Sequence, residues 1–173
     1  MERTMRRPPG GRAEPRGLRI AVCGPGQAEV VHRLTRAAFS GQSALDPPSG
    51  AGRETLDEVR ADLAAHCGAI AWLGGRAVGC LRFERAAEHM HVRRVAVEPE
   101  LQGGGIGGAL MAWAEADARR HGLPEVTVGV RLALARNLAW YRRLGYEVVG
   151  EHAHPGHDRP TWASLRKRVP AGP

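Results

Sequence analysis

The chain has 173 residues, of which 43% are hydrophobic, and a formal net charge of +7. This length fits one domain, and the apolar content suffices for a hydrophobic core, which excludes a disordered segment and a disulfide-stapled miniprotein. The longest apolar stretch, residues 69–73, is far shorter than the ~20 residues of a membrane helix, and no apolar segment follows the N-terminal arginines as in a secretory signal.

The positive charge is concentrated at the two ends of the chain. Residues 1–19 carry six arginines against two glutamates, and residues 159–173 carry four basic residues and no acid. The body between them is nearly neutral, so the charge does not indicate a nucleic-acid surface. Residues 1–17, rich in Arg, Pro and Gly, are predicted to form a disordered basic tail. We expect one folded domain over residues 18–168 and a C-terminal tail over residues 169–173.

The first half of the domain is predicted from its hydrophobic spacing. A strand over Leu18–Cys23 is followed by a helix over Ala28–Phe39. The segment Ser40–Arg53 is a loop, because its prolines and glycines disfavour helical and ladder hydrogen bonds. A second helix has an apolar face running from Leu56 to Cys67, with Gly68 as its left-handed C-terminal residue.

The second half begins with two short apolar runs around Gly74-Gly75, which predict a hairpin. The elements expected after it alternate between strands and helices: a strand over His89–Val97, a helix over Gly105–His121, a strand over Val126–Val130, a helix over Arg136–Leu144, and strands over Tyr146–Gly150 and Thr161–Arg168. The predicted order is β-α-α-β-β-β-α-β-α-β-β. Antiparallel hairpins combined with one strand-helix-strand crossover indicate an α+β (mixed α/β) fold.

A glycine-rich loop between a strand and a helix carries the strongest functional signal. Five of the six residues Gly103–Gly108 are glycine. Glycines let main-chain N–H groups approach an anion where a helix begins with its positive dipole end, so the loop is predicted to bind a phosphate or pyrophosphate. A Walker loop is disfavoured, because Gly108-Ala109 stands where Lys-Ser or Lys-Thr is needed. A dinucleotide fold is disfavoured too, because residues 98–101 intervene between the strand and the glycine loop.

A third phosphate-binding design fits the loop. The pattern Gln102-x-x-Gly105-x-Gly107, after an apolar strand and before an amphipathic helix, resembles motif A of the GNAT superfamily of N-acetyltransferases. The segment from Asn137 to Tyr146 is similar to the Asn-x-x-Ala-x-x-x-Tyr-x-x-x-Gly-Phe/Tyr segment of that superfamily. The resemblance extends from about residue 18 to residue 168. It implies a mixed, mostly antiparallel sheet with one splayed parallel strand pair, flanked by helices.

The resemblance also implies acetyl-CoA as the acetyl donor, bound between the strand ending at Val97 and the strand Val126–Val130. Main-chain groups of the first strand would hold the pantetheine arm, and the glycine loop would hold the pyrophosphate. Gly104 stands where members of the superfamily often carry Arg or Lys, so a side-chain contact to phosphate is missing. The implied cofactor-binding residues are Val95, Ala96, Val97, Gln102, Gly103, Gly104, Gly105, Ile106, Gly107, Gly108, Asn137 and Tyr141.

Tyr141 is the candidate general acid, which donates a proton to the departing thiolate. Gly129 stands where many relatives have a glutamate base, so the base has to be sought elsewhere. Glu84 is the first candidate, with Glu54, His154 and water-mediated proton removal as alternatives. No metal is expected, because the histidines of segment 151–158 lack matching Cys or acidic ligands.

The acceptor is expected between the loops Ser40–Arg53 and His152–Pro160. The acids and imidazoles of these loops, together with Glu54 at the start of the second helix, suit a cationic amine. The candidate acceptor-binding residues are Asp46, Ser49, Glu54, His154 and Asp158. Cys23, Cys67 and Cys80 are expected to be buried packing residues in a reducing cytoplasm, so the amine attacks the thioester directly.

The predicted function is therefore transfer of an acetyl group from acetyl-CoA to a primary amine of a small molecule or a protein. The alternative is a non-catalytic acyl-CoA sensor or interaction module on the same fold. The expected partner is a small-molecule or peptide amine, with a homodimer left open and with neither nucleic acid nor a membrane.

Overall fold

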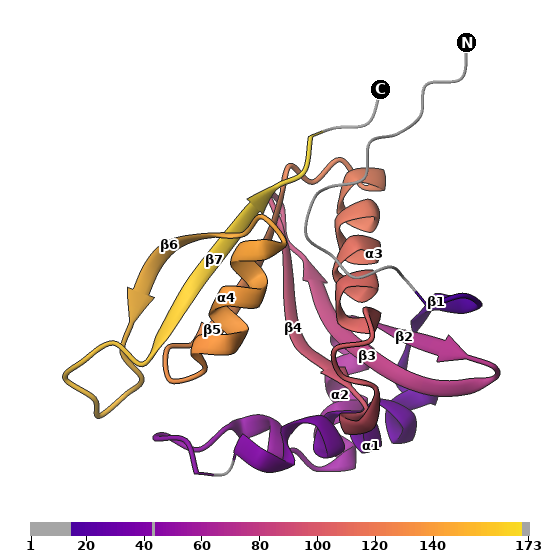
Figure 1. Ribbon diagram of the computed structural model, residues 1–173, viewed down its shortest axis with the longest axis horizontal. Helices are drawn as coiled ribbons and strands as arrows, with labels where there is room; N and C mark the ends of the chain where they lie inside the picture. The colour runs from indigo at the N-terminus through magenta and orange to yellow at the C-terminus, as the bar shows by residue number, and fades with distance from the viewer. Residues whose placement is uncertain (1–14, 43, 171–173) are drawn as a thin grey trace.

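The architecture is taken from a computed structural model that describes residues 15–42 and 44–170. The predicted basic tail up to residue 14 and the tail from residue 171 lie outside the described residues. The central layer is a seven-stranded sheet in the order β1-β2-β3-β4-β5-β7-β6 (Figure 1). The strands are β1 Leu18–Cys23, β2 Cys67–Leu73, β3 Arg76–Arg85, β4 Met90–Val97, β5 Glu125–Arg131, β6 Glu147–His152 and β7 Trp162–Arg168.

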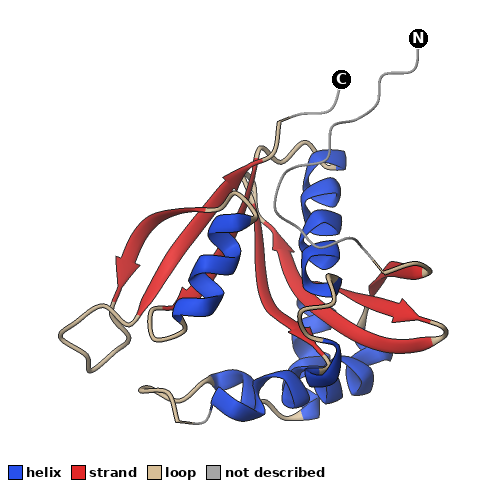
Figure 2. Ribbon diagram, in the orientation of Figure 1, coloured by secondary structure: helices blue, strands red, loops and turns tan. Residues whose placement is uncertain are grey.

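Four α-helices accompany the sheet in the described part of the chain (Figure 2). They are α1 Ala28–Phe39, α2 Leu56–Ala65, α3 Ile106–Arg120 and α4 Ala135–Arg143. The predicted order of strands and helices and the α+β class are confirmed. All strand pairs are antiparallel except β4 with β5, which is parallel.

Two apolar clusters pack on opposite faces of the sheet. Because side chains of a strand alternate between faces, Ala69 and Ala71 of β2 join one cluster while Ile70 joins the other. The first cluster packs α3 and α4 against the sheet, and the second packs α1 and α2 against the other face. The sheet therefore separates an α3/α4 side from an α1/α2 side.

The end of the second predicted helix was wrong. The helix stops at Ala65, and Cys67 and Gly68 already belong to β2, paired with β3. A Cβ on Gly68 would lie 2.7 Å from Cys23 Sγ and 2.8 Å from Leu63 Cδ2. Gly68 is therefore needed for close packing of β2 against its neighbours, and it does not supply a left-handed helix terminus.

The parallel pair β4 and β5 is only partly joined. Met90 to Val92 pair with Val126 to Val128, and no pairing continues beyond them. β4 remains paired with β3 and β5 with β7, so the two strands diverge with each half of the sheet (Figure 1). A bulge at Arg94, which has a positive φ of 55°, bends β4 where the separation begins. The divergence leaves main-chain groups on the facing edges without strand partners.

Candidate active site

A cleft of about 640 Å³ opens where β4 and β5 diverge. Its walls come from both faces of the sheet, from α4 on one face and from the segment after α1 and the β6–β7 loop on the other. It is lined by Phe39, Gln42, Pro47, Pro48, Ser49, Gly50, His91, Val92, Arg93, Arg94, Val95, Gly129, Val130, Arg131, Leu134, Asn137, Tyr141, His154, Pro155 and Trp162. The cleft passes through the sheet, so groups from both faces can meet in it.

The glycine loop forms the start of α3 beside this cleft. Gly105, with a φ of 93°, is the N-cap, a conformation that glycine adopts without strain. The first helical bond runs from the Ala109 amide to the Gly105 carbonyl over 3.0 Å. The amides of residues 106–108 therefore precede the helical ladder at the positive end of the helix dipole.

Gly107 lies where the loop approaches α4. A Cβ on this residue would lie 3.2 Å from Trp140 Cζ2 and 3.8 Å from Val97 Cγ2. The absence of a side chain lets Trp140 of α4 and the end of β4 pack closely against the start of α3. Gln102 is exposed, and its Nε2 donates to the Val97 carbonyl over 3.2 Å. The loop and the end of β4 thus form one polar cradle.

Tyr141 and Asn137 project from α4 into the cleft lining. Tyr141 is 8% exposed, and its ring contacts Trp140 and Tyr146 edge-on, with centroids 4.6 Å and 5.6 Å away. Burial raises the pKa of the Tyr141 hydroxyl, which keeps it protonated at neutral pH. Tyr146 has a different role, because its hydroxyl donates to Glu115 Oε1 inside the core.

His91 is a cleft residue that the sequence patterns did not single out. Its Nδ1 lies 3.0 Å from Thr127 Oγ1, across the paired part of β4 and β5. Burial, followed by the charges of Arg93 and His89, lowers the pKa of His91, while Glu84 opposes the shift. His91 is therefore neutral at pH 7. When Nδ1 donates to Thr127, Nε2 keeps a lone pair, and Nε2 has no partner among the described residues.

His154 also lines the cleft, and both of its ring nitrogens are engaged. Nδ1 contacts Thr161 Oγ1, and Nε2 lies 3.2 Å from Arg131 Nη1. Since an arginine only donates, His154 Nε2 accepts this bond. Desolvation, Arg131 and His157 lower the pKa of His154, consistent with a neutral ring. Arg131 also donates from Nη2 to the Pro47 carbonyl.

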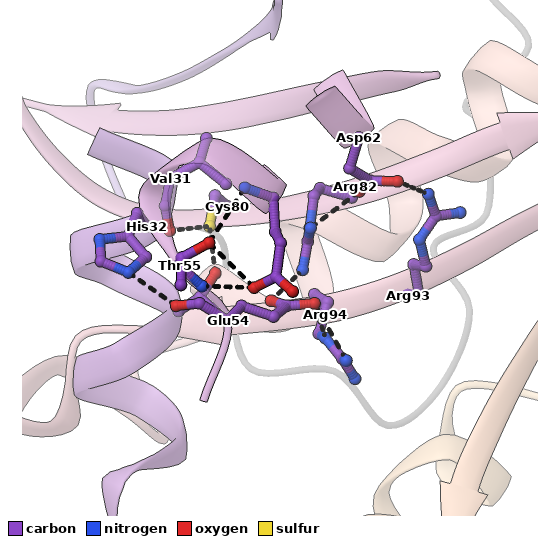
Figure 3. Close-up of polar contacts among 11 residues, drawn as sticks. Val31, His32, Glu54, Thr55, Asp62, Cys80, Arg82, Arg93 and Arg94 are labelled. Atoms are coloured by element: carbon purple, nitrogen blue, oxygen red, sulfur yellow. Dashed lines mark hydrogen bonds and ion pairs between the residues drawn. The ribbon is translucent and has the colours of Figure 1, made fainter. Parts of the chain in front are cut away.

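Arg82, Arg93 and Arg94 form an arginine cluster with Glu54 and Asp62 on the α1/α2 side of the sheet (Figure 3). Arg82 is 2% exposed and donates to Asp62 over 2.8 Å and to Glu54 over 2.6 Å. Asp62 also accepts from Arg93, and Glu54 also accepts from Arg94 over 3.1 Å. Arg93 and Arg94 line the cleft, whereas Arg82 is buried beneath them. Two carboxylates thus hold three guanidinium groups.

Of the predicted cofactor residues, Val95, Asn137 and Tyr141 line the cleft, whereas the glycine loop lies outside its lining at the start of α3. The predicted acceptor residues are divided as well. Ser49 and His154 line the cleft, while Glu54 is held by Arg82 and Arg94 behind it. The Asp46 side chain is 89% exposed, and Asp158 is exposed outside the cleft lining.

Glu84, the first candidate for the base, does not line the cleft. It is exposed on β3 beside His91, and its carboxylate lies 4.0 Å from His66 Nδ1. The position of His91 depends on the register between β4 and β5, which no spacing in the sequence reveals. The one signal in the sequence is a histidine in the strand before the glycine loop.

No group of three or more His, Cys, Asp or Glu side chains in residues 15–42 and 44–170 is arranged to hold a metal ion. Within the same residues, none of the helices has the length and apolar character needed to cross a membrane.

Comparison with solved structures finds the same fold in several acetyltransferases. The ribosomal-protein-S18-alanine N-acetyltransferase of Escherichia coli is similar with a TM-score of 0.72 at 14% identity, over 90% of this chain and 96% of that one. The PaiA N-acetyltransferase of Thermoplasma acidophilum, solved in complex with coenzyme A, has a TM-score of 0.72 at 15% identity, over 87% of this chain and 98% of that one. A GNAT-family acetyltransferase from Streptococcus pneumoniae has a TM-score of 0.67 at 17% identity, with coverages of 88% and 99%.

Sequence comparison identifies the family. No curated protein sequence matches the chain. The profile of the acetyltransferase (GNAT) family matches residues 32–146, more than half of the chain, and this range includes the glycine loop, β5 and α4. The splayed strands, the glycine cradle and this match agree, and the chain belongs to the GNAT acetyltransferase family.

Proposed function

We propose that this protein transfers the acetyl group of acetyl-CoA to a primary amine of a small molecule or a protein. The observation that carries the proposal is the cleft between β4 and β5, which is lined by Asn137 and Tyr141 from α4 and by the neutral His91 from β4. A donor and an acceptor entering from opposite faces would meet at the separation of the strands.

The residues present fit a coenzyme A thioester. The unpaired edge of β4 at Val95, Ala96 and Val97 offers main-chain groups to the amides of a pantetheine arm. The amides of residues 106–108, which precede the helical ladder at the start of α3, suit a pyrophosphate. Asn137 and Tyr141 complete the site from α4. Bound acetyl-CoA supplies an activated thioester.

In our proposal, side chains of this protein carry out two proton transfers, one from the amine and one to the sulfur of CoA. His91 Nε2 accepts a proton from the amine, because its neutral ring faces the cleft and its Nδ1 is fixed by Thr127. The Tyr141 hydroxyl remains protonated and donates a hydrogen bond to the sulfur as negative charge develops there. This hydroxyl proton then passes to the departing thiolate to give the free thiol of CoA, after which solvent returns a proton to Tyr141 and takes the amine proton from His91.

Three earlier candidates for the base fit this role less well. Glu84 lies outside the cleft lining, and Glu54 accepts hydrogen bonds from two arginines. Both ring nitrogens of His154 are engaged. His91 therefore replaces Glu84 as the proposed base, and a water molecule held by His91 provides the same route at longer range.

We also propose direct attack by the amine and a cytoplasmic location. Cys23, Cys67 and Cys80 are free thiols, and none of them lines the cleft. Burial raises the pKa of Cys23 and Cys80 to about 12, which makes them poor nucleophiles. No acetyl-cysteine intermediate is supported by these positions.

Two measurements test the proposed function. Calorimetry with acetyl-CoA is expected to show saturable binding, and a thiol-release assay over a broad amine panel is expected to show turnover well above hydrolysis. Failure to bind acetyl-CoA at millimolar concentration would refute the proposal. Binding without turnover on any amine would instead favour an acyl-CoA sensor.

A further inference from the structure

The acceptor part of the cleft has an unusual charge. None of its lining residues is Asp or Glu, whereas Arg93, Arg94 and Arg131 all line it. A cationic amine without an acidic group, the kind of acceptor that the acids and imidazoles of the loops suggested, would meet no carboxylate in this lining. Asp46 and Asp158, which were expected to receive it, lie outside the cleft lining.

The cluster beneath the cleft does not neutralise its own arginines. Glu54 and Asp62 are the carboxylates that contact Arg82, Arg93 and Arg94 (Figure 3). Arginine stays protonated at any accessible pH. Three guanidinium groups facing two carboxylates leave one excess positive charge, and the two arginines at the surface of the cluster present it to the cleft.

Arg131 adds a second uncompensated charge. Its contacts are with neutral acceptors, the Pro47 carbonyl and His154 Nε2, and no carboxylate pairs with it in the described part of the chain. A guanidinium has five N–H donors. The Nε–H of Arg131 is buried and has no hydrogen-bond partner among the described residues. The group is therefore fixed in position, and the second N–H of Nη1 and of Nη2 has no partner among the described residues.

At the Arg131 end of the cleft, two loops are connected through the side chain of Arg131. Arg131 links β5 to Pro47 in one loop and to His154 in the other, and His157 Nε2 lies 3.8 Å from Asp46 Oδ1. Trp162 pairs with Arg131 across β5 and β7, and its ring lies 3.6 Å from the position of a Cβ on Gly129. The end is bounded by two bridged loops and an indole, which suits a small molecule better than an extended peptide.

We propose that the acceptor is a small primary amine that also carries a carboxylate, and that Arg131 binds this carboxylate. The planar fork of a guanidinium matches the two oxygens of a carboxylate, and charge-assisted hydrogen bonds of this kind are stronger than neutral ones. The excess charge of the arginine cluster favours the same anion. This inference rests on the proposed acetyl transfer and narrows its acceptor.

Matched acceptors test the proposal. The panel contains ω-amino acids of increasing length, the diamine and the ω-amino amide of each length, the α-amino acids with their amides, and phosphoethanolamine beside β-alanine. The wild-type kcat/KM for the best carboxylate is expected to exceed that for its amide and its diamine by at least about tenfold, the effect of one hydrogen bond to a charged group.

Arg131→Gln is expected to remove this preference for the acid over the amide. Arg131→Lys, which keeps the charge without the fork, is expected to retain part of it. The test compares kcat/KM for the acid with kcat/KM for the amide. A general loss of activity, caused by loss of the contact between Arg131 and Pro47, would lower both values and leave their ratio unchanged. Arg36→Gln is the control, since it removes an exposed guanidinium on α1 outside the cleft lining and is expected to leave the ratio unchanged.

Preference for diamines, amides or phosphoethanolamine in the wild type would overturn the inference while leaving acetyl transfer intact. So would an unchanged ratio in Arg131→Gln. If no amine is turned over, calorimetry of the same carboxylates on protein saturated with CoA decides. Binding that Arg131→Gln abolishes supports the carboxylate site, and absence of binding refutes it. Absence of acetyl-CoA binding itself would refute the proposed function.

Discussion

His91 and Glu84 stand side by side on neighbouring strands, yet only His91 faces the cleft. We predict that His91→Gln lowers kcat by about 100-fold, the usual contribution of a general base, while acetyl-CoA affinity is unchanged. Glu84→Gln, one strand away, is the matched control and is expected to retain most of the activity. Steady-state kinetics with both variants would distinguish them, and a larger loss in Glu84→Gln would restore the glutamate as the base.

The pH dependence of kcat/KM provides a second test of His91. Burial and the charges of Arg93 and His89 lower its pKa from 6.5, with Glu84 opposing them. The base is active when neutral, so activity is present at neutral pH and is lost as the pH falls through this lowered pKa. The acid limb of the profile is therefore expected below pH 6.5 and is expected to disappear in His91→Gln. A limb above pH 7 would point to another group.

Substitution of Tyr141 and of Tyr146 is expected to have different effects, because Tyr141 is proposed to act in turnover and Tyr146 packs in the core. Tyr141→Phe is predicted to lower kcat about 10- to 100-fold and to leave the dissociation constant of acetyl-CoA within about twofold. Tyr146→Phe removes the hydrogen bond to Glu115 in the core, so its effect is expected in the unfolding midpoint. Calorimetry and denaturant unfolding of both variants check the pair. Equal losses of cofactor affinity would remove Tyr141 from its proposed role.

Arg82 is the buried centre of the arginine cluster. Its side chain fills a core position and donates two hydrogen bonds, so Arg82→Met is predicted to destabilise the fold by about 3 kcal/mol. The exposed pair of Arg60 with Asp57 makes a similar contact, but solvent screens it, and Arg60→Met is expected to cost less than about 0.5 kcal/mol. Urea unfolding of the two variants makes the comparison, which similar midpoints would contradict.

At the scale of elements, the start of α3 provides the clearest prediction. Gly107→Glu would press against Trp140 and place a negative charge at the proposed anion site, so acetyl-CoA binding is expected to be lost. Ala112→Glu adds the same charge to an exposed position of the same helix and is expected to bind normally. Calorimetry compares the two, and unimpaired binding in Gly107→Glu would move the phosphate site elsewhere.

The elements themselves were largely predictable from the sequence, because their apolar spacing and their terminating glycines agree. The junction at Cys67 and Gly68 was the exception. Its glycine follows a helical apolar face as a C-terminal glycine would, but it serves the approach of Cys23 and Leu63 to β2. That distinction depends on tertiary contacts, which the local sequence pattern does not contain.

At the scale of the molecule, the contacts that could not be predicted from the sequence depend on the register between strands and on loops distant in the chain. The cradle was predictable because its residues are contiguous in the chain. The pairing of His91 with Thr127 depends on β4 and β5, and the contacts of Arg131 depend on two loops distant in the sequence. Asp46 and Asp158, the acids expected at the acceptor, lie outside the cleft lining, which contains three arginines instead. Arg93 and Arg94 of β4 and Arg131 of β5 all line the cleft, although the two strands are far apart in the sequence.

The sheet divides the molecule into an α3/α4 side and an α1/α2 side, and the proposed donor and acceptor sites lie on different sides. The cradle at α3 and α4 lies on one face, and the loops Ser40–Arg53 and His152–Pro160 approach the cleft from the other. Replacing the β6–β7 loop with a glycine-serine linker should therefore change acceptor preference while leaving acetyl-CoA affinity within about threefold, or 0.7 kcal/mol. His154→Ala should reproduce part of the change because it releases Arg131, whereas Asp158→Ala should not. Kinetics over the amine panel and calorimetry with acetyl-CoA measure the two halves separately, and a loss of cofactor affinity equal to the change in acceptor preference would contradict the division.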